Sequence, residues 1–167
     1  LTLNAGSTLD LRINASVGAY PVVINGNTTI NSGRASNGAG LTHTLGTLSM
    51  GTATLTIAEG NAVSNNTAYG VTFGATTLTG NATIAGLAAN GSGLATLTLG
   101  ALNDAGGART LTKGPLDSLR VPGLAQTASL VRLLAGPADA LEIGEGGRLL
   151  LDVGNGRRWR ILLDRDR

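Results

Sequence analysis

The chain has 167 residues, which suits one domain, and its composition is unusual because 26 residues are Gly and only four are aromatic. Globular cores draw much of their buried area from aromatic side chains, so this interior must be filled by Leu, Val, Ile, Ala and Thr. The net charge of +2 comes from basic residues that are interleaved with acidic ones and lack aromatic stacking partners, which argues against nucleic acid as a partner. No apolar run reaches the roughly 20 residues of a membrane helix, so we expect no transmembrane segment.

Short runs of alternating Thr and apolar residues recur from the first residue onward. Thr is β-branched and favours strands, and twenty Thr lie within the first 113 residues, against one in the rest. Gly or Asn closes nearly every run, as expected at turns. The strands predicted in the first hundred residues are 1–3, 8–13, 22–24, 28–30, 47–50, 52–57, 71–73, 76–79, 82–84 and 95–99.

Three of these runs, within 51–56, 74–80 and 93–100, share a centre made of a small residue followed by Thr-Leu-Thr. Their leucines, Leu55, Leu78 and Leu97, are 23 and 19 residues apart. A period of about 20 residues is the length of one solenoid coil, and coils must stack because none buries its apolar face alone. The pattern therefore predicts an all-β, right-handed parallel β-solenoid (β-helix).

The C-terminal part has a different composition. Residues 1–108 hold five charged side chains and residues 109–167 hold seventeen. We therefore predict two parts: Thr/Gly-rich solenoid repeats in 1–115 and a charged, Arg-rich section in 116–167. That section is either an atypical C-terminal cap or a small antiparallel sheet, and a short helix over 124–134 is an alternative to a strand there. The strands predicted in it are 119–121, 130–134, 141–143, 148–153 and 159–163.

Three segments carry a family resemblance: Val71-Thr72-Phe73-Gly74-Ala75-Thr76-Thr77-Leu78-Thr79-Gly80-Asn81-Ala82-Thr83, Leu97-Thr98-Leu99-Gly100-Ala101-Leu102-Asn103-Asp104 and Arg109-Thr110-Leu111-Thr112-Lys113. They resemble the autotransporter-associated β-strand repeats of long bacterial surface and secreted proteins. The resemblance covers about residues 40–115 well and 1–40 loosely. Residues 116–167 depart from it, because Gly114-Pro115-Leu116 stands where the family continues with another Gly-Thr-Leu-Thr-Leu strand.

The resemblance implies a passenger-type β-helix that is exported to the bacterial cell surface or beyond it, with no catalytic residues. The chain opens directly on a strand-like pattern and shows no signal peptide, so we expect it to be a piece of a longer precursor. We expect it to associate with itself or with neighbouring repeats of that precursor. Surface glycans are an alternative partner.

Candidate catalytic residues are few. His43 is the only histidine, and Ser49 and Asp10 are the partners that a triad would use. No nucleophile motif accompanies them, so a histidine in a turn or at a sheet edge is the simpler interpretation. Asp139, Glu142 and Glu145 are close enough in sequence for the paired acid and base of a glycosidase, but a solvated turn is the simpler explanation for them. We predict no catalytic site and no enzyme activity.

Candidate binding residues also have simple structural explanations. The segment 103–107, Asn-Asp-Ala-Gly-Gly, offers oxygen ligands for calcium or forms a plain turn. With no Cys and one His, zinc is not expected, and we predict neither a metal nor a cofactor. The patch 157–160, Arg-Arg-Trp-Arg, is either a partner site or a charge-protected edge strand. Five Asn-x-Ser/Thr sequons indicate either glycosylation or stacking of Asn in solenoid turns, at Asn14, Asn27, Asn65, Asn81 and Asn90.

Two functions remain in competition. A structural module of a surface protein needs only the repeat, and head-to-tail stacking into a fibre is one version of it. An adhesin would need an exposed aromatic or charged ladder on one face. A β-helix enzyme acting on carbohydrate ranks third.

Overall fold

The computed structural model describes residues 1–86, 93–107, 109–114, 118–121, 131–134, 140–143 and 150–151. Within these residues every named element is a β-strand and every strand pair is parallel. The protein is thus an all-β solenoid of stacked coils, as the sequence predicts. Its right-handed sense stays a prediction, based on the hand that nearly all parallel crossover connections take.

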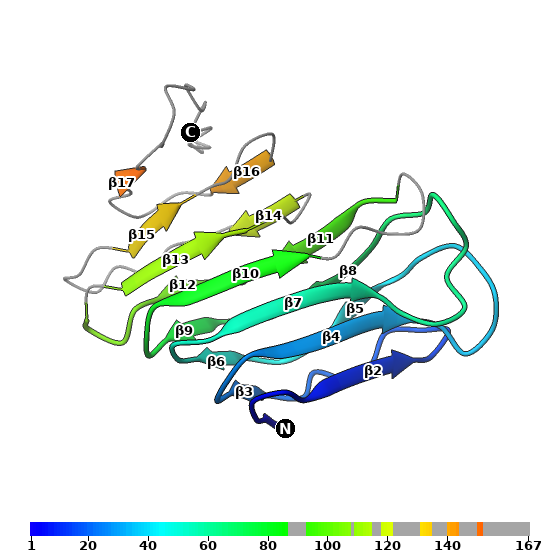
Figure 1. Cartoon of the computed structure of the whole chain (residues 1–167), viewed down its shortest axis with the longest axis horizontal. Helices are drawn as coiled ribbons and strands as arrows, with labels where there is room; N and C mark the ends of the chain where they lie inside the picture. The colour runs from blue at the N-terminus through cyan, green and yellow to red at the C-terminus, as the bar shows by residue number, and fades with distance from the viewer. Residues whose placement is uncertain are drawn as a thin grey trace.

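The strands form three parallel sheets that we name A, B and C (Figure 1). Sheet A contains, in order, β1 (Thr2–Leu3), β3 (Val22–Ile24), β6 (Leu48–Met50), β9 (Thr76–Leu78) and β12 (Leu102–Asn103). Sheet B contains β2 (Thr8–Arg12), β4 (Thr28–Gly33), β7 (Thr54–Glu59), β10 (Ala82–Gly86), β13 (Arg109–Lys113), β15 (Val131–Leu134) and β17 (Leu150–Leu151). Sheet C contains β5 (Thr42–Thr44), β8 (Tyr69–Thr72), β11 (Ala95–Thr98), β14 (Ser118–Val121) and β16 (Ala140–Ile143).

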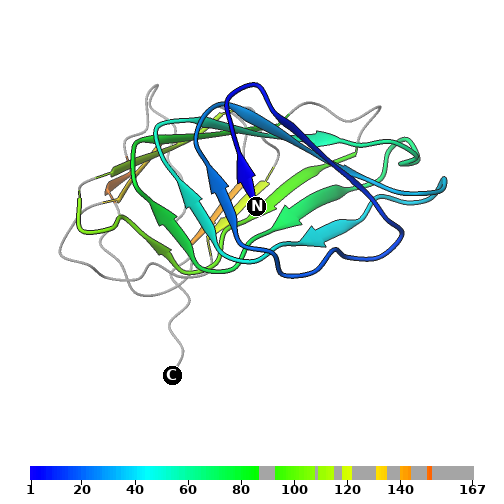
Figure 2. The same cartoon turned by 90° about the horizontal axis from the view of Figure 1, so that it is seen from below.

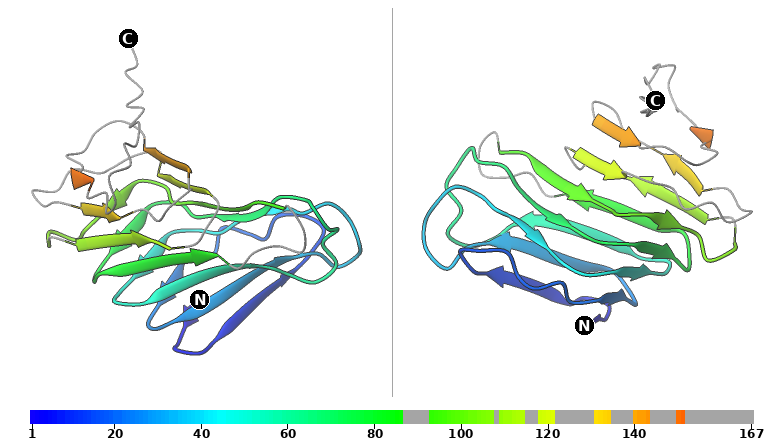
Figure 3. Two further views of the ribbon diagram at one scale, coloured as in Figure 1. Left: turned by 45° about the horizontal axis from the view of Figure 1, so that its top comes forward. Right: turned by 180° about the vertical axis from the view of Figure 1, so that it is seen from behind.

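From β3 to β14 the chain visits sheets A, B and C in turn, so each coil contributes one strand to each sheet. Figure 2 looks at the end of the stack where β1 and β2 lie, and Figure 3 shows the ladder from two other sides. No helix in the described part of the chain is long and apolar enough to span a membrane.

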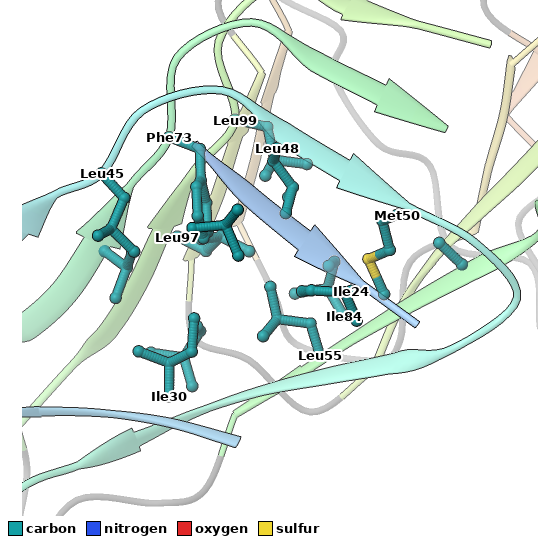
Figure 4. Close-up of a cluster of buried hydrophobic side chains, with 14 of the residues drawn as sticks. Ile24, Ile30, Leu45, Leu48, Met50, Leu55, Phe73, Ile84, Leu97 and Leu99 are labelled. Carbon is teal, nitrogen blue, oxygen red and sulfur yellow. The ribbon is translucent and has the colours of Figure 1, made fainter. Parts of the chain in front are cut away.

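The interior is built by the alternation that the sequence shows. In β7, Leu55 is fully buried while Thr54 and Thr56 on either side are half-buried and face outward. Burying such a side chain stabilises the fold by about 1.5–3 kcal/mol. Figure 4 shows a cluster of buried apolar side chains between the sheets, with Leu55 among them. Residues in register form inward columns along the stack: Ile24, Met50 and Leu78 in sheet A; Thr28, Leu55 and Ile84 in sheet B; His43, Val71, Leu97 and Leu119 in sheet C.

The three leucines that suggested the repeat do not stack on one another. Leu55 lies in sheet B, Leu78 in sheet A and Leu97 in sheet C. Coils close to the predicted length of about 20 residues do occur, because residues in register are 21 positions apart in β1 and β3 and 22 positions apart in β11 and β14. Other coils are longer, since hydrogen bonds between adjacent coils also join residues 27 or 29 positions apart. The three runs look alike because every face of a coil needs the same inward and outward alternation.

All ten strands predicted in the first hundred residues are present. Three other described strands were not among those predicted: β5, which carries a histidine at its centre, β12, which has two residues, and β13. None of them had enough alternating apolar residues to be recognised.

The parallel ladder extends past Gly114, where the Thr-rich repeat ends in the sequence. Strands β14 and β16 continue sheet C, and β15 and β17 continue sheet B. These described strands are parallel, which excludes an antiparallel arrangement for them, and Val131–Leu134 forms a strand rather than part of a helix. The division at residue 115 and the capping role of residues 116–167 stay predictions. The predicted strand at 159–163 lies outside the described residues.

Candidate functional site

The residues of the possible triad fall on three different sheets. His43 is in β5 of sheet C, Ser49 in β6 of sheet A and Asp10 in β2 of sheet B. His43 points into the interior, whereas Asp10 is on the surface. The structure therefore does not bring these three side chains together.

His43 is a core residue. It lies on the terminal strand of sheet C, so the predicted sheet edge is right, but the alternative of a turn is wrong because the residue is within β5 and fully buried. Its Nε2 lies 2.9 Å from the carbonyl oxygen of Gly33, which can only accept, so Nε2 carries the proton. Nδ1 is buried and has no hydrogen-bond partner among the residues that the structure describes. This ring begins the inward column of sheet C, and the alternating Leu-Thr-His-Thr-Leu of residues 41–45 was the signal for it.

Asp10 belongs to a small polar cluster on the outer face of sheet B. Its Oδ1 accepts a hydrogen bond from Nδ2 of Asn31 on the neighbouring strand at 2.8 Å. Its Oδ2 accepts from Nη2 of Arg12 at 2.8 Å and from Nε at 3.2 Å. The hydrogen bond from Asn31, followed by that from Arg12, lowers the pKa of the Asp10 carboxyl. The cluster thus joins β2 to β4 and supplies a charged edge.

The segment 103–107 forms a turn in which two side-chain oxygens accept hydrogen bonds from backbone N–H groups of the same segment. Oδ1 of Asn103 accepts from the Ala105 N–H at 3.2 Å, and Oδ1 of Asp104 accepts from the Gly106 N–H at 3.1 Å. The turn places Ala105 and Gly106 in the left-handed region, at φ of 52° and 80°. Among the described residues no group of three His, Cys, Asp or Glu side chains could hold a metal ion. The segment 103–107 is therefore a turn.

Two charged residues, Lys113 and Asp104, are buried in the interior close to the start of the C-terminal section. Lys113 is in register with Ile84 and is only 2% exposed, and Asp104, one residue after β12, is 1% exposed. The sequence analysis missed both as buried residues. The signal was present, because Lys113 occupies the inward position of the Thr-Leu-Thr-Lys alternation.

Three sequon asparagines hold adjacent coils together. Oδ1 of Asn27 accepts from the Thr54 N–H at 2.8 Å, and Oδ1 of Asn81 accepts from the Thr110 N–H at 3.0 Å. Oδ1 of Asn14 accepts from two backbone N–H groups, those of Ala35 and Ser36. These Asn side chains thus join adjacent coils at the turns of the solenoid, which is one of the two alternatives that the sequence analysis gave for the sequons. Of the other two sequons, Asn65 is exposed and Asn90 lies outside the described residues.

Of the remaining candidate residues, the structure describes only Glu142. Glu142 lies in β16, in register with Arg120 of β14. Asp139, Glu145 and the patch 157–160 lie outside the described residues.

The outer edge of β5, the terminal strand of sheet C, is covered by residues 13–21, which we name the strap. The strap joins β2 to β3 and is not a strand. Oγ of Ser16 accepts from the Thr44 N–H at 2.7 Å, and the Tyr20 carbonyl oxygen accepts from the Gly46 N–H at 2.9 Å. Val17 packs against the core. The edge strand β5 is therefore covered by irregular chain in the place where a further strand would pair.

No family model matches the chain, and no curated protein or solved structure matches it.

Proposed function

We propose that the chain is a structural solenoid module of an exported bacterial surface protein, acting as a rigid segment through coil-on-coil stacking with neighbouring repeats. The observation that carries the proposal is the use of the polar side chains. The side chains of Asn14, Asn27 and Asn81 accept hydrogen bonds from backbone N–H groups of the adjacent coil. A rod needs such contacts along its whole length.

The inward columns support the same function. Leu55 lies between Thr28 and Ile84 of the adjacent coils, and Leu97 lies between Val71 and Leu119. Each coil therefore gains its buried area from its neighbours, so the array is stiff along its axis and tolerates changes in coil number. The resemblance to autotransporter-associated repeats supports export to the cell surface or the extracellular space.

The outward columns favour a structural module over an adhesin. Sheet C presents Thr44, Thr72 and Thr98 in one row, and sheet B presents Thr54, Thr83 and Thr112. These side chains are short and uncharged. In the described part of the chain the row on sheet C continues with the exposed Arg120, and these rows otherwise hold no succession of aromatic rings or charges of the kind that an adhesin would use to recognise glycans.

Duplicating one coil tests the proposal. Thr83 is in register with Thr54, so a second copy of residues 54–82 inserted after residue 82 adds one complete coil. We expect a folded, longer protein with a single unfolding transition and at least the stability of the parent. The matched control carries the same inserted residues in scrambled order and should lose stability. An inserted coil that is no better tolerated than the scrambled one would contradict a modular role.

Location is tested separately. The full gene, expressed with a tag in this chain, should place the tag where added protease cleaves it in intact cells. A glycan array that shows binding by the purified chain would favour the adhesin instead.

A further inference from the structure

We propose that Asn25 is a site of spontaneous deamidation, in which the backbone nitrogen of Gly26 attacks the side-chain amide, and that the product weakens the bonding of this turn to the coils on either side. Asn25 and Gly26 lie in the turn between β3 and β4. The same dipeptide occurs at Asn37 and Gly38, in the loop after β4, and the fold protects it there. This chemistry is separate from the proposed structural role and does not depend on it.

The reaction joins two groups that are already adjacent in the chain. The backbone nitrogen of Gly26 bonds to the side-chain carbonyl carbon of Asn25, and the amide nitrogen leaves as ammonia together with the Gly26 proton. One water then opens the resulting cyclic imide at either carbonyl, which gives aspartate or isoaspartate. The balance is one water consumed and one ammonia released, with no change of oxidation state. A Gly in the second position favours ring closure because it has no Cβ to obstruct it.

Both reacting groups are accessible at Asn25. Its side chain is exposed, and its amide makes a long hydrogen bond, in which Nδ2 lies 3.4 Å from Oδ1 of Asn4. The Gly26 N–H donates no hydrogen bond to any residue that the structure describes. The attacking nitrogen therefore has no such bond to break before it approaches the side chain.

Asn37 has the same neighbour and the same exposure, but its backbone is held. Both asparagines are exposed and both following glycines are half-buried. The Gly38 N–H donates to the carbonyl oxygen of Ala62 at 3.1 Å, and the Gly38 carbonyl oxygen accepts from the Ser64 N–H at 2.8 Å. Gly38 is thus paired through both backbone groups, and its nitrogen can react only after this pairing opens locally.

The turn that contains Asn25 is bonded to the coils on both sides. Towards one coil, the Asn25 N–H donates to the carbonyl oxygen of Leu3 at 2.9 Å. The carbonyl oxygen of Asn27 accepts from the Gly6 N–H of the same coil at 2.8 Å. Towards the other coil, Oδ1 of Asn27 accepts from the Thr54 N–H at 2.8 Å. A change of backbone length in this turn therefore affects contacts in both directions.

Isoaspartate makes such a change, because the main chain then runs through the former side chain and gains one carbon atom. The turn has little room for that atom: a Cβ built on Gly26 would lie 2.7 Å from Cβ of Ala5 and 2.9 Å from its Cα. The added atom displaces Asn27 from its partners. Isoaspartate at position 25 therefore loosens the stacking of this turn.

Peptide-level mass spectrometry tests the site. The folded parent is incubated in mildly alkaline buffer, and the conversion of Asn25 and of Asn37 is followed in separate peptides. We expect Asn25 to convert about fivefold faster, the factor that one backbone hydrogen bond of ordinary strength adds to a barrier. In protein unfolded by urea the two rates should become similar, because neither site then has a fixed backbone.

The comparison of folded and unfolded protein makes the assignment falsifiable. Equal rates in the folded protein, or faster conversion at Asn37, would overturn it. A ratio that stays the same in urea would also overturn it, since the difference would then come from the neighbouring sequence and not from the fold.

Ageing the variant Asn25→Gln tests the effect on stacking. Gln keeps the amide, but its longer side chain would have to close a larger ring and does so far more slowly. Asn37→Gln is the matched control. Two further Asn-Gly pairs, at 90–91 and 155–156, lie outside the described residues and are common to all three proteins, so they cancel in the comparison.

The measurement is the change in urea midpoint of each protein relative to its own fresh sample. The midpoints of the parent and of Asn37→Gln should fall in step with the isoaspartate content at position 25, and that of Asn25→Gln should fall less. Equal falls in all three proteins would contradict the claim that conversion of Asn25 loosens the turn.

Discussion

The side-chain oxygen of Asn27 accepts the backbone N–H of Thr54, which lies 27 residues further along the chain and one coil away. Asn81 repeats this relationship with Thr110 in a later coil. Both asparagines directly precede a strand of sheet B. Each continues the ladder of hydrogen bonds by one position at the corner of the coil, where the backbone turns away from the sheet.

Replacing either asparagine by Ala should therefore weaken the stacking of two coils. We expect Asn27→Ala and Asn81→Ala each to lower the free energy of unfolding by about 1 kcal/mol, because a backbone N–H loses its acceptor. The bonds lie in different coils, so the double variant should lose about the sum. Urea denaturation measures the effect. Asn65→Ala, on an exposed loop, is the matched control and should change stability little.

The inward columns make a larger contribution. Leu55→Ala should lower the free energy of unfolding by about 2–5 kcal/mol, because Leu55 is fully buried between Thr28 and Ile84 and its removal leaves a cavity. Val23→Ala is the control: Val23 lies on the outward side of sheet A and is 39% exposed, so its loss should cost less than about 1 kcal/mol. Equal losses in the two variants would contradict the assignment of inward and outward residues.

The sequence predicted the strands well because alternation is a local property. It could not assign strands to sheets, because that assignment depends on where each turn delivers the chain. Leu55, Leu78 and Leu97 appeared equivalent in the sequence, yet they lie on three different sheets. Turns of different length separate them, and such lengths have no pattern that reveals the coil.

The residues around the candidate site were harder to predict for a related reason. His43 is a core residue because β5 places it in an inward column, and β5 was not recognised because this inward position holds a histidine instead of an apolar residue. The strap has no sequence pattern at all. Its role follows from the contacts of Ser16 and Tyr20 with a strand more than twenty residues away, which only the fold brings together.

Asp10 gives a pH-dependent contribution. Its pKa is lowered in the folded protein by Asn31 and Arg12, so the folded state favours the carboxylate. The resulting stability is present above the ordinary pKa of an aspartate and is lost as the pH falls through the lowered pKa. Because the group is exposed, we expect only about 0.5 kcal/mol.

The comparison for this prediction is between the parent and Asp10→Asn. The parent should be the more stable at neutral pH, and the difference should vanish in acid, where both side chains are uncharged. High salt should reduce the difference at neutral pH, because it screens the exposed pair with Arg12. A difference that does not change with pH would mean that the carboxylate charge contributes nothing.

Close stacking of turns gives a prediction about glycine. The Gly100 N–H donates to the carbonyl oxygen of Gly74 at 3.0 Å, and a Cβ built on Gly100 would lie 2.5 Å from the backbone of Gly74. Backbone atoms cannot move aside as a flexible side chain can. Gly100→Ala should therefore push two coils apart and lower the free energy of unfolding by about 1–3 kcal/mol, measured by urea denaturation.

Gly51→Ala is the matched control, since a Cβ there would meet nothing closer than Oγ1 of Thr79 at 3.7 Å. That distance is an ordinary contact, so the substitution should be tolerated. The two variants add the same methyl group, and the difference between them isolates the distance between adjacent coils. If Gly100→Ala were as stable as Gly51→Ala, the coils would not be stacked as closely as 2.5 Å implies, and the hydrogen bond between Gly100 and Gly74 would be in doubt.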